Sequence, residues 1–160
     1  HVAGVAGLVK AQNPNYTHLQ IRNAILNTVD DNSSLSGKVV TEGRVNAFNA
    51  VTYLAPPANL VASDFGNGYV TLRWDANNAN ALMGYKILYT DPFGIRNELN
   101  VVNITNYIVS GLINETTYEF TVRAVGNFPN VGVIEGLSSI SVYETPSGPS
   151  TGGGGGGGGG

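Results

Sequence analysis

Cysteine is absent from this sequence, and charged residues are scarce. Without cysteine the chain forms no disulfide and offers a metal no thiolate ligands. Charged residues make up 12% of the chain and the formal net charge is −3, whereas a nucleic-acid-binding protein needs a basic surface. No stretch reaches the roughly 18 apolar residues of a membrane span. We therefore expect no nucleic-acid partner, no membrane span in this piece and no cofactor.

The first fourteen residues, HVAGVAGLVKAQNP, are small or apolar at almost every position. A helix that is apolar on all sides is normally buried, and Pro14 marks its end. Gly4 and Gly7 each cost a helix about 1 kcal/mol relative to alanine, which favours close packing against another backbone. In this chain alone we expect four side chains of the helix to stay partly exposed: Val2, Val5, Leu8 and Val9.

Two further helices are predicted before residue 55. Thr17 and Gln20 form a capping-box pattern at the start of the first, and an apolar stripe follows as far as Thr28. Asn46 is a good N-cap for a short helix that runs through Tyr53. Because three helices of about fifty residues bury too little surface for an independent domain, we expect residues 1–54 to depend on other structure.

The stretch between these helices, residues 30–41, is rich in Asp, Asn, Ser and Gly and is typical of a surface loop. Its segment Asp30-Asp31-Asn32 has oxygen ligands of the kind calcium takes, but the spacing of a dedicated calcium loop is absent. Ser33, Ser34 and Ser36 have no histidine and carboxylate at a recognisable catalytic spacing. We therefore predict no metal site and no catalytic residue here.

Four segments of residues 1–54 resemble motifs of the subtilisin-like serine proteases. They follow the order of that family: His1–Val9, Asn13–Arg22, Asn27–Asp30 and Gly43–Ala47. The resemblance implies that residues 1–54 are the C-terminal helices of a truncated α/β peptidase domain, in which the first helix is buried against a parallel sheet. It also implies that the nucleophilic serine lies just upstream of His1, so the 160 residues themselves hold no catalytic residue and are inactive.

The same resemblance implies a parent protein that is a secreted serine endopeptidase acting on polypeptide substrates by acyl transfer. A structural calcium ion belongs to the parent's expected features, although no site for one is seen in these residues. His1 matches a structural histidine of the family rather than its catalytic base.

The pattern changes after Ala55-Pro56-Pro57, a proline-rich linker over residues 55–57 that stops the last helix. Beyond the linker, apolar and polar residues alternate with the period of two that is typical of strands. The clearest runs are 70–75, 85–90 and 118–124, and shorter ones surround Leu60, 107–112 and 137–142. About six or seven short strands separated by turn residues predict an antiparallel β-sandwich.

Residues 57–145 resemble a fibronectin type III domain, an immunoglobulin-like all-β sandwich. The residues that carry the resemblance are Pro57, Leu60, Leu72, Trp74, Tyr85, Leu112, Thr117, Tyr118, Val122 and Ala124. The resemblance implies that Trp74 fills the centre of the sandwich. It also implies that Tyr118 makes a tyrosine corner, in which its hydroxyl bonds back to the preceding loop.

Most aromatic side chains lie on the inward phase of the predicted strands, and we expect five of them in the core: Trp74, Tyr85, Tyr89, Tyr118 and Phe120. Phe93 and Phe128 lie among turn residues, so they are the candidates for loop contacts with a ligand. An extracellular protein or a polysaccharide is the expected class of ligand. The remaining residues, 146–160, end in nine glycines, Gly152–Gly160, and are expected to form a disordered tether.

Two functional hypotheses follow for this mixed chain of a short all-α fragment and an all-β sandwich. In the first, the chain is the C-terminal part of a secreted subtilisin-like endopeptidase, and the sandwich is its spacer or docking module. In the second, the chain is a non-catalytic extracellular binding or adhesion module that carries a degenerate protease remnant. Both place the protein outside the cell or on its surface.

Overall fold

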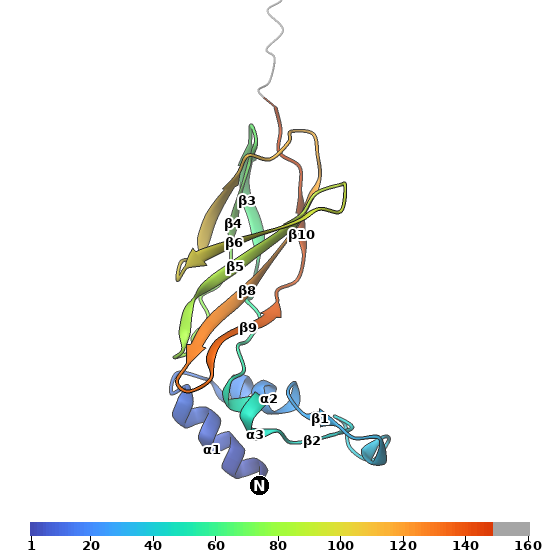
Figure 1. The fold of residues 1–160 in the computed structure, drawn as a ribbon, viewed down its shortest axis with the longest axis vertical. Helices are drawn as coiled ribbons and strands as arrows, with labels where there is room; N and C mark the ends of the chain where they lie inside the picture. The colour runs from blue at the N-terminus through green and yellow to red at the C-terminus, as the bar shows by residue number, and fades with distance from the viewer. Residues whose placement is uncertain (149–160) are drawn as a thin grey trace, which may run out of the picture.

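The computed structural model describes residues 1–148, in which a small group of helices sits at one end of an elongated β-sandwich (Figure 1). The expected glycine tether, Gly152–Gly160, lies outside the described residues. Residues 1–148 contain three α-helices, one short 3-10 helix and ten strands. The helices precede the sandwich in the chain, as the sequence predicts, and so do the two shortest strands, which it does not predict.

The three α-helices are α1 (Val2–Gln12), α2 (His18–Leu26) and α3 (Ala47–Val51), and each packs against the other two. The predicted caps are confirmed. Thr17 and Gln20 form a complete capping box at the start of α2, and the Asn46 side chain accepts a hydrogen bond of 2.9 Å from the Asn49 backbone N–H. These caps satisfy N–H groups that a helix leaves unpaired at its start.

Between α2 and α3 the chain extends sideways as a loop closed by a two-residue pairing of strands β1 (Asp30–Asp31) and β2 (Gly43–Arg44) (Figure 1). The short 3-10 helix η1 (Ser33–Leu35) lies within the loop. The sequence predicts the loop but not this pairing, because two residues are too few to show an alternating pattern.

The sandwich consists of two antiparallel sheets. The three-stranded sheet has the order β3-β4-β7, with β3 (Val61–Gly66), β4 (Tyr69–Arg73) and β7 (Asn106–Ser110). The five-stranded sheet has the order β10-β8-β5-β6, with β9 also paired to β8. Its strands are β5 (Leu82–Thr90), β6 (Arg96–Val102), β8 (Tyr118–Phe128), β9 (Gly132–Ser138) and β10 (Val142–Glu144).

The outer strand beside β8 is divided into two pieces. Strand β9 pairs with the end of β8 nearest the helices, and β10 pairs with the other end. Ser139 lies between the pieces, where its backbone N–H donates to the Val122 carbonyl (2.8 Å) and its Oγ accepts from the Val122 N–H (3.0 Å). The single residue thus keeps the middle of β8 paired while the outer strand bends away.

The aromatic centre of the sandwich agrees with the prediction. Trp74 is buried and meets Tyr85 edge to face, with ring centroids 5.3 Å apart. Tyr118 and Phe120 are also buried, and the Ile113 backbone N–H donates to the Tyr118 hydroxyl at 3.0 Å, which confirms the tyrosine corner. Tyr89 is only half-buried, and its ring stacks on the edge of this cluster against Phe120.

Helix α1 divides into a buried and an open side, so the expected exposure of its four apolar residues holds for two of them. Val5 and Val9 are buried against the other helices, whereas Val2 and Leu8 are 56% and 55% exposed. The expected close packing at Gly4 and Gly7 is wrong within this chain, because a Cβ added at either would meet nothing within 4 Å. The open side of α1 is therefore small, apolar and uncovered.

Two strands of the sandwich differ from the prediction: one is not predicted at all, and one ends later than predicted. Strand β6 was not expected, because polar Asn97 stands at a half-buried position where an alternating pattern would show an apolar residue. Strand β8 continues to Phe128, although Gly126 and the residues after it are typical of a turn.

Candidate functional site

The turn between β5 and β6 presents two large apolar side chains to solvent. Phe93 is 78% exposed and Ile95 is 58% exposed. The turn lies at the end of the sandwich away from the helices, because β5 begins near them and runs to the far end (Figure 1). The prediction that Phe93 lies in an exposed loop is confirmed in its structural part, and ligand contact at Phe93 stays a prediction.

The backbone of this turn is held by hydrogen bonds from a single residue. Asp91 Oδ1 accepts from the backbone N–H groups of Phe93 (3.0 Å) and Ile95 (2.8 Å). The Asp91 N–H donates to the Ile95 carbonyl (3.1 Å), and the Gly94 N–H donates to the Asp91 carbonyl (3.0 Å). Gly94 has a φ of +79°, which glycine adopts at little cost. The turn is thus a fixed platform for its two apolar side chains.

Phe128, the second candidate for loop contact, lies in a different setting. It is the last residue of β8 and is only 3% exposed. The expectation that it lies in an open loop is wrong, because the inward alternation of β8 continues two residues past Gly126 and carries the Phe128 ring into the core. Phe93 and Phe128 therefore belong to different environments and do not form one site.

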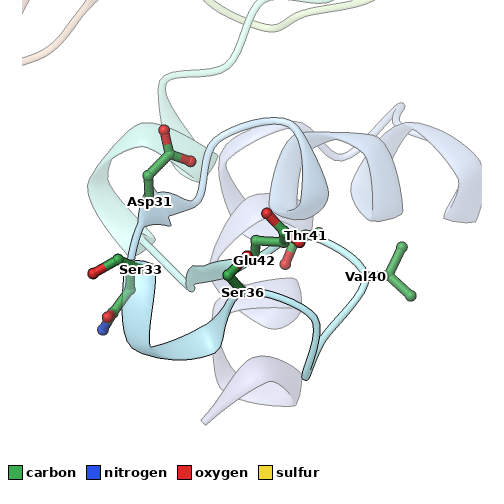
Figure 2. Close-up of a pocket in the computed structure, with 7 residues that line it drawn as sticks. Asp31, Ser33, Ser36, Val40, Thr41 and Glu42 are labelled. Atoms are coloured by element: carbon green, nitrogen blue, oxygen red, sulfur yellow. The ribbon is translucent and has the colours of Figure 1, made fainter.

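The loop between α2 and α3 encloses a shallow hollow of about 610 Å³. Figure 2 shows the polar side chains of Asp31, Ser33 and Glu42 on it, with Val40 to one side. The Glu42 carboxylate already accepts from the Gly37 N–H (3.1 Å), and the residues that line the hollow include no histidine to act as a base for a serine. The polar lining of the hollow is therefore typical of a surface loop rather than of a catalytic site.

Nearby, Asp30 is used structurally: its carboxylate accepts from Asn46 Nδ2 (2.8 Å) and lies 3.7 Å from the Arg44 guanidinium. In residues 1–148, no group of three or more His, Cys, Asp and Glu side chains is placed to hold a metal ion. None of the described helices is long and apolar enough to cross a membrane.

The outward face of the five-stranded sheet carries a small ionic network. Lys86 lies between Glu98 (3.4 Å) and Glu135, and the other oxygen of Glu135 is 3.6 Å from Arg123. The hydrogen bond that the Lys86 ammonium donates to Glu135 raises the pKa of Lys86, and the same bond lowers the pKa of the Glu135 carboxyl. Two cations and two carboxylates balance here, so the network gives the face no net charge with which to attract a charged ligand.

Comparison with known proteins identifies the sandwich. Residues 55–130 match the fibronectin type III domain family. A Kelch domain-containing protein of Saccharolobus solfataricus is 33% identical over 106 residues, which are 64% of this chain and 14% of that protein. Receptor-type tyrosine-protein phosphatase F of Danio rerio is 31% identical over 96 residues, which are 59% of this chain and 5% of that protein. The chain thus spans a small part of the curated relatives it matches.

Solved structures agree with this assignment at the level of the fold. The third fibronectin III domain of a human protein superposes with a TM-score of 0.52 at 21% identity, over 62% of this chain and 87% of that domain. The fn3 domain of human collagen alpha-1(XX) chain superposes with a TM-score of 0.50 at 19% identity, over 62% of this chain and 90% of that domain. Residues 1–54 lie outside the family match.

Proposed function

We propose that this chain, which contains a fibronectin type III domain, is a non-catalytic binding module of an extracellular or cell-surface protein. The observation that carries the proposal is the β5–β6 turn, where Asp91 holds Phe93 and Ile95 in an exposed and fixed arrangement. Apolar side chains that are preorganised for contact lose little conformational entropy on binding. The similarity to a receptor-type phosphatase supports a module of this kind at a cell surface.

The chemistry of the turn favours a protein ligand over a polysaccharide. Sites for small polar ligands combine an apolar surface with convergent polar groups, whereas the Asp91 carboxylate is engaged with the turn's own backbone. Phe93 and Ile95 together resemble the apolar anchors that fill pockets at protein interfaces. We therefore propose an extracellular protein with an apolar pocket as the partner.

The proposal is tested with the full chain and immobilised probes. Collagen, gelatin and fibrinogen represent extracellular proteins, and cellulose and chitin represent polysaccharides. We expect retention on at least one protein surface, and we expect Phe93→Ala to weaken it by about thirtyfold, which equals the loss of about 2 kcal/mol that marks an anchor residue. Val40→Ala, which alters another fully exposed side chain, is the matched control. Retention that Phe93→Ala leaves unchanged would contradict a role for this turn, and retention on polysaccharides alone would contradict a protein partner.

A second function is favoured by the open side of α1. We propose that residues 1–54 are the C-terminal helices of a subtilisin-like peptidase domain, as their four sequence motifs imply, and that the parent protein cleaves polypeptides. In support, Val2 and Leu8 are more than half exposed and the space beside Gly4 and Gly7 is empty, which is the state of a core helix without its neighbours. Such a domain would supply the missing cover.

A fluorophosphonate probe, which labels an activated serine, separates the two functions. We expect the parent protein to be labelled and the 160-residue chain to remain unlabelled. An unlabelled parent protein would refute the peptidase and leave the binding module as the function of the chain. Binding at Phe93 is measured in a separate experiment, by retention on the immobilised probes. Either proposal can therefore fail without the other.

A further inference from the structure

Leu54 connects the helices to the sandwich by fitting into a seat made of two glycines. It is 2% exposed and directly precedes the linker at residues 55–57. A Cβ added to Gly136 of β9 would lie 2.8 Å from the Leu54 Cβ and 2.7 Å from the Leu54 carbonyl oxygen. A Cβ added to Gly126 of β8 would lie 3.2 Å from the Leu54 Cδ1. Leu54 thus occupies the space that side chains at both positions would fill.

The backbone gives no other reason for glycine at these two positions. Neither Gly126 nor Gly136 is among the residues with a positive φ, so any residue can adopt their conformations. Glycine within a strand weakens the strand and often marks the close approach of another backbone. At Gly136 the close approach comes from the Leu54 side chain and carbonyl, which lie at the junction with the helices. At Gly126 the Leu54 side chain shares the space with the Ala81 carbonyl oxygen of the sandwich, 3.0 Å from an added Cβ, so Gly136 is the position that Leu54 alone accounts for.

Polar contacts fix the same junction. Asn13, which follows α1, is completely buried, and its Oδ1 accepts from the Asn80 backbone N–H at 2.9 Å. Asn77 Nδ2 donates to the Ala55 carbonyl at 2.7 Å. Residues 77 and 80 both belong to the β4–β5 connection, so this one loop of the sandwich contacts the end of α1 and the linker that follows α3. The Asn13 Nδ2 is buried without a hydrogen-bond partner, so only the Oδ1 contact offsets the cost of burying this amide. That contact favours the arrangement in which Asn80 lies against Asn13.

The apolar core runs through the junction without interruption. Val9 and Tyr16 of the helical segment, Leu54, and Phe128 of the sandwich all belong to one cluster of buried residues. Figure 1 shows the β8–β9 turn beside the helices at the lower end of the sandwich. A flexible linker would leave each of these side chains exposed part of the time.

We propose that this end of the sandwich, formed by the β4–β5 connection and the Gly126 and Gly136 positions, is a dedicated docking surface for the chain's own helical segment. Its occupant is Leu54 with Asn13. The helices and the sandwich then move and unfold as one rigid unit rather than as two domains on a tether. The end of the sandwich that the helices cover is thereby closed to other partners, whereas the β5–β6 turn at the opposite end stays open. The inference concerns the chain's own architecture and does not depend on which ligand binds.

Distance measurements between two spin labels test the rigid junction. The chain has no native cysteine, so Asn23→Cys on α2 and Ser110→Cys on β7, both exposed, give a unique labelled pair in the full chain. We expect a single narrow distance distribution. We expect Gly136→Ala to shift and broaden the distribution, because the new Cβ displaces Leu54. A broad distribution without Gly136→Ala, or an unchanged narrow one with it, would overturn the proposal.

Two further variants keep the test decisive. Gly4→Ala is the matched control, since a Cβ there meets nothing within 4 Å, and the distribution should stay narrow. If Gly136→Ala does not fold, Leu54→Ala empties the seat without a clash and should broaden the distribution in the same way. Trp74 fluorescence, which reports only the sandwich, should follow the same thermal transition as helical circular dichroism in the unaltered chain and separate from it in Leu54→Ala. Coincident transitions in Leu54→Ala together with a narrow distribution would overturn the docking role.

Discussion

The helical segment and the sandwich bury their apolar residues to very different degrees. In the sandwich, two sheets face each other, and Tyr85 and Phe120 between them are at most 1% exposed. In the helical segment, Val9 is equally buried while Leu8, its neighbour in α1, is 55% exposed. A two-layer sandwich encloses its own core, whereas three short helices cover only one side of α1. The comparison shows that the sandwich buries its inward side chains on both sheets, whereas one side of α1 stays apolar and uncovered within the described residues.

The largest effect should come from the centre of the sandwich. We expect Trp74→Ala to lower the free energy of unfolding by about 3–5 kcal/mol, because it removes a buried aromatic and leaves a cavity. Urea denaturation followed by circular dichroism measures the change. Phe93→Ala is the control and should stay within about 0.5 kcal/mol, as an exposed substitution. A loss for Trp74→Ala below about 1 kcal/mol would show that the sandwich core is not the main source of stability.

In the helical segment, we expect Tyr16→Phe to lower stability by about 1–3 kcal/mol, since the Tyr53 carbonyl loses a buried donor. Tyr16 is 1% exposed, and its hydroxyl donates to that carbonyl at 3.1 Å. Burial raises the pKa of Tyr16 from 10.0 to about 12.

The raised pKa also predicts a dependence on alkaline pH. The folded state holds the Tyr16 proton more tightly than the unfolded chain, so this stabilisation is complete below pH 10.0 and is lost as the pH rises to about 12. Tyr16→Phe should therefore show a smaller loss of stability over that interval than the unaltered chain. Equal losses in both proteins would mean that another group dominates the alkaline transition.

A substitution on the open side of α1 should raise the stability of the chain, by less than the losses described above. We expect Gly7→Ala to raise the stability of this chain by about 0.5–1 kcal/mol, because alanine is the better helix former and its Cβ meets nothing. Thermal denaturation measures the gain. In the parent protein the same change should destabilise, if a further domain packs closely there. A loss of stability in the 160-residue chain itself would show that this side of α1 is already covered.

The smallest effect should come from the ionic network on the sheet. We expect Glu135→Gln to cost less than about 1 kcal/mol, because the pairs are partly exposed. The bond to Lys86 lowers the pKa of Glu135, so its contribution is present at neutral pH and is lost as the pH falls through the lowered pKa. The difference between the two proteins should therefore vanish in acid and shrink in high salt. A difference that persists in both conditions would point to packing rather than charge.

The sequence predicts the interior of the sandwich far better than its edges. Alternation along β4, β5 and β8 places Trp74 and Tyr118 correctly, because these central strands pack one face against the opposite sheet. Strand β6 is an edge strand with Asn97 in an inward position, so its period is masked. The alternation of apolar and polar residues along one strand does not show which other part of the chain each residue contacts.

The same reason explains the outcome for the candidate site. Phe93 follows Asp91-Pro92, whose turn chemistry is local, so its exposure is predictable. Phe128 and Gly126 are turn-like in composition, but their surroundings come from residues far away in the chain: Phe128 joins the buried core, and Gly126 faces the Ala81 carbonyl and the Leu54 side chain. The only local signal is a glycine inside an alternating run, which indicates a close approach without saying what approaches.

The divided outer strand beside β8 has a consequence for solubility. A long, straight edge strand presents unpaired backbone groups on which another chain can add a strand. Here Ser139 caps the middle of β8 through Val122 and bends the strand between β9 and β10. Each remaining edge piece is therefore short and aimed differently. This break guards the sandwich against adding strands from other molecules along that edge, which would otherwise join separate sheets into one.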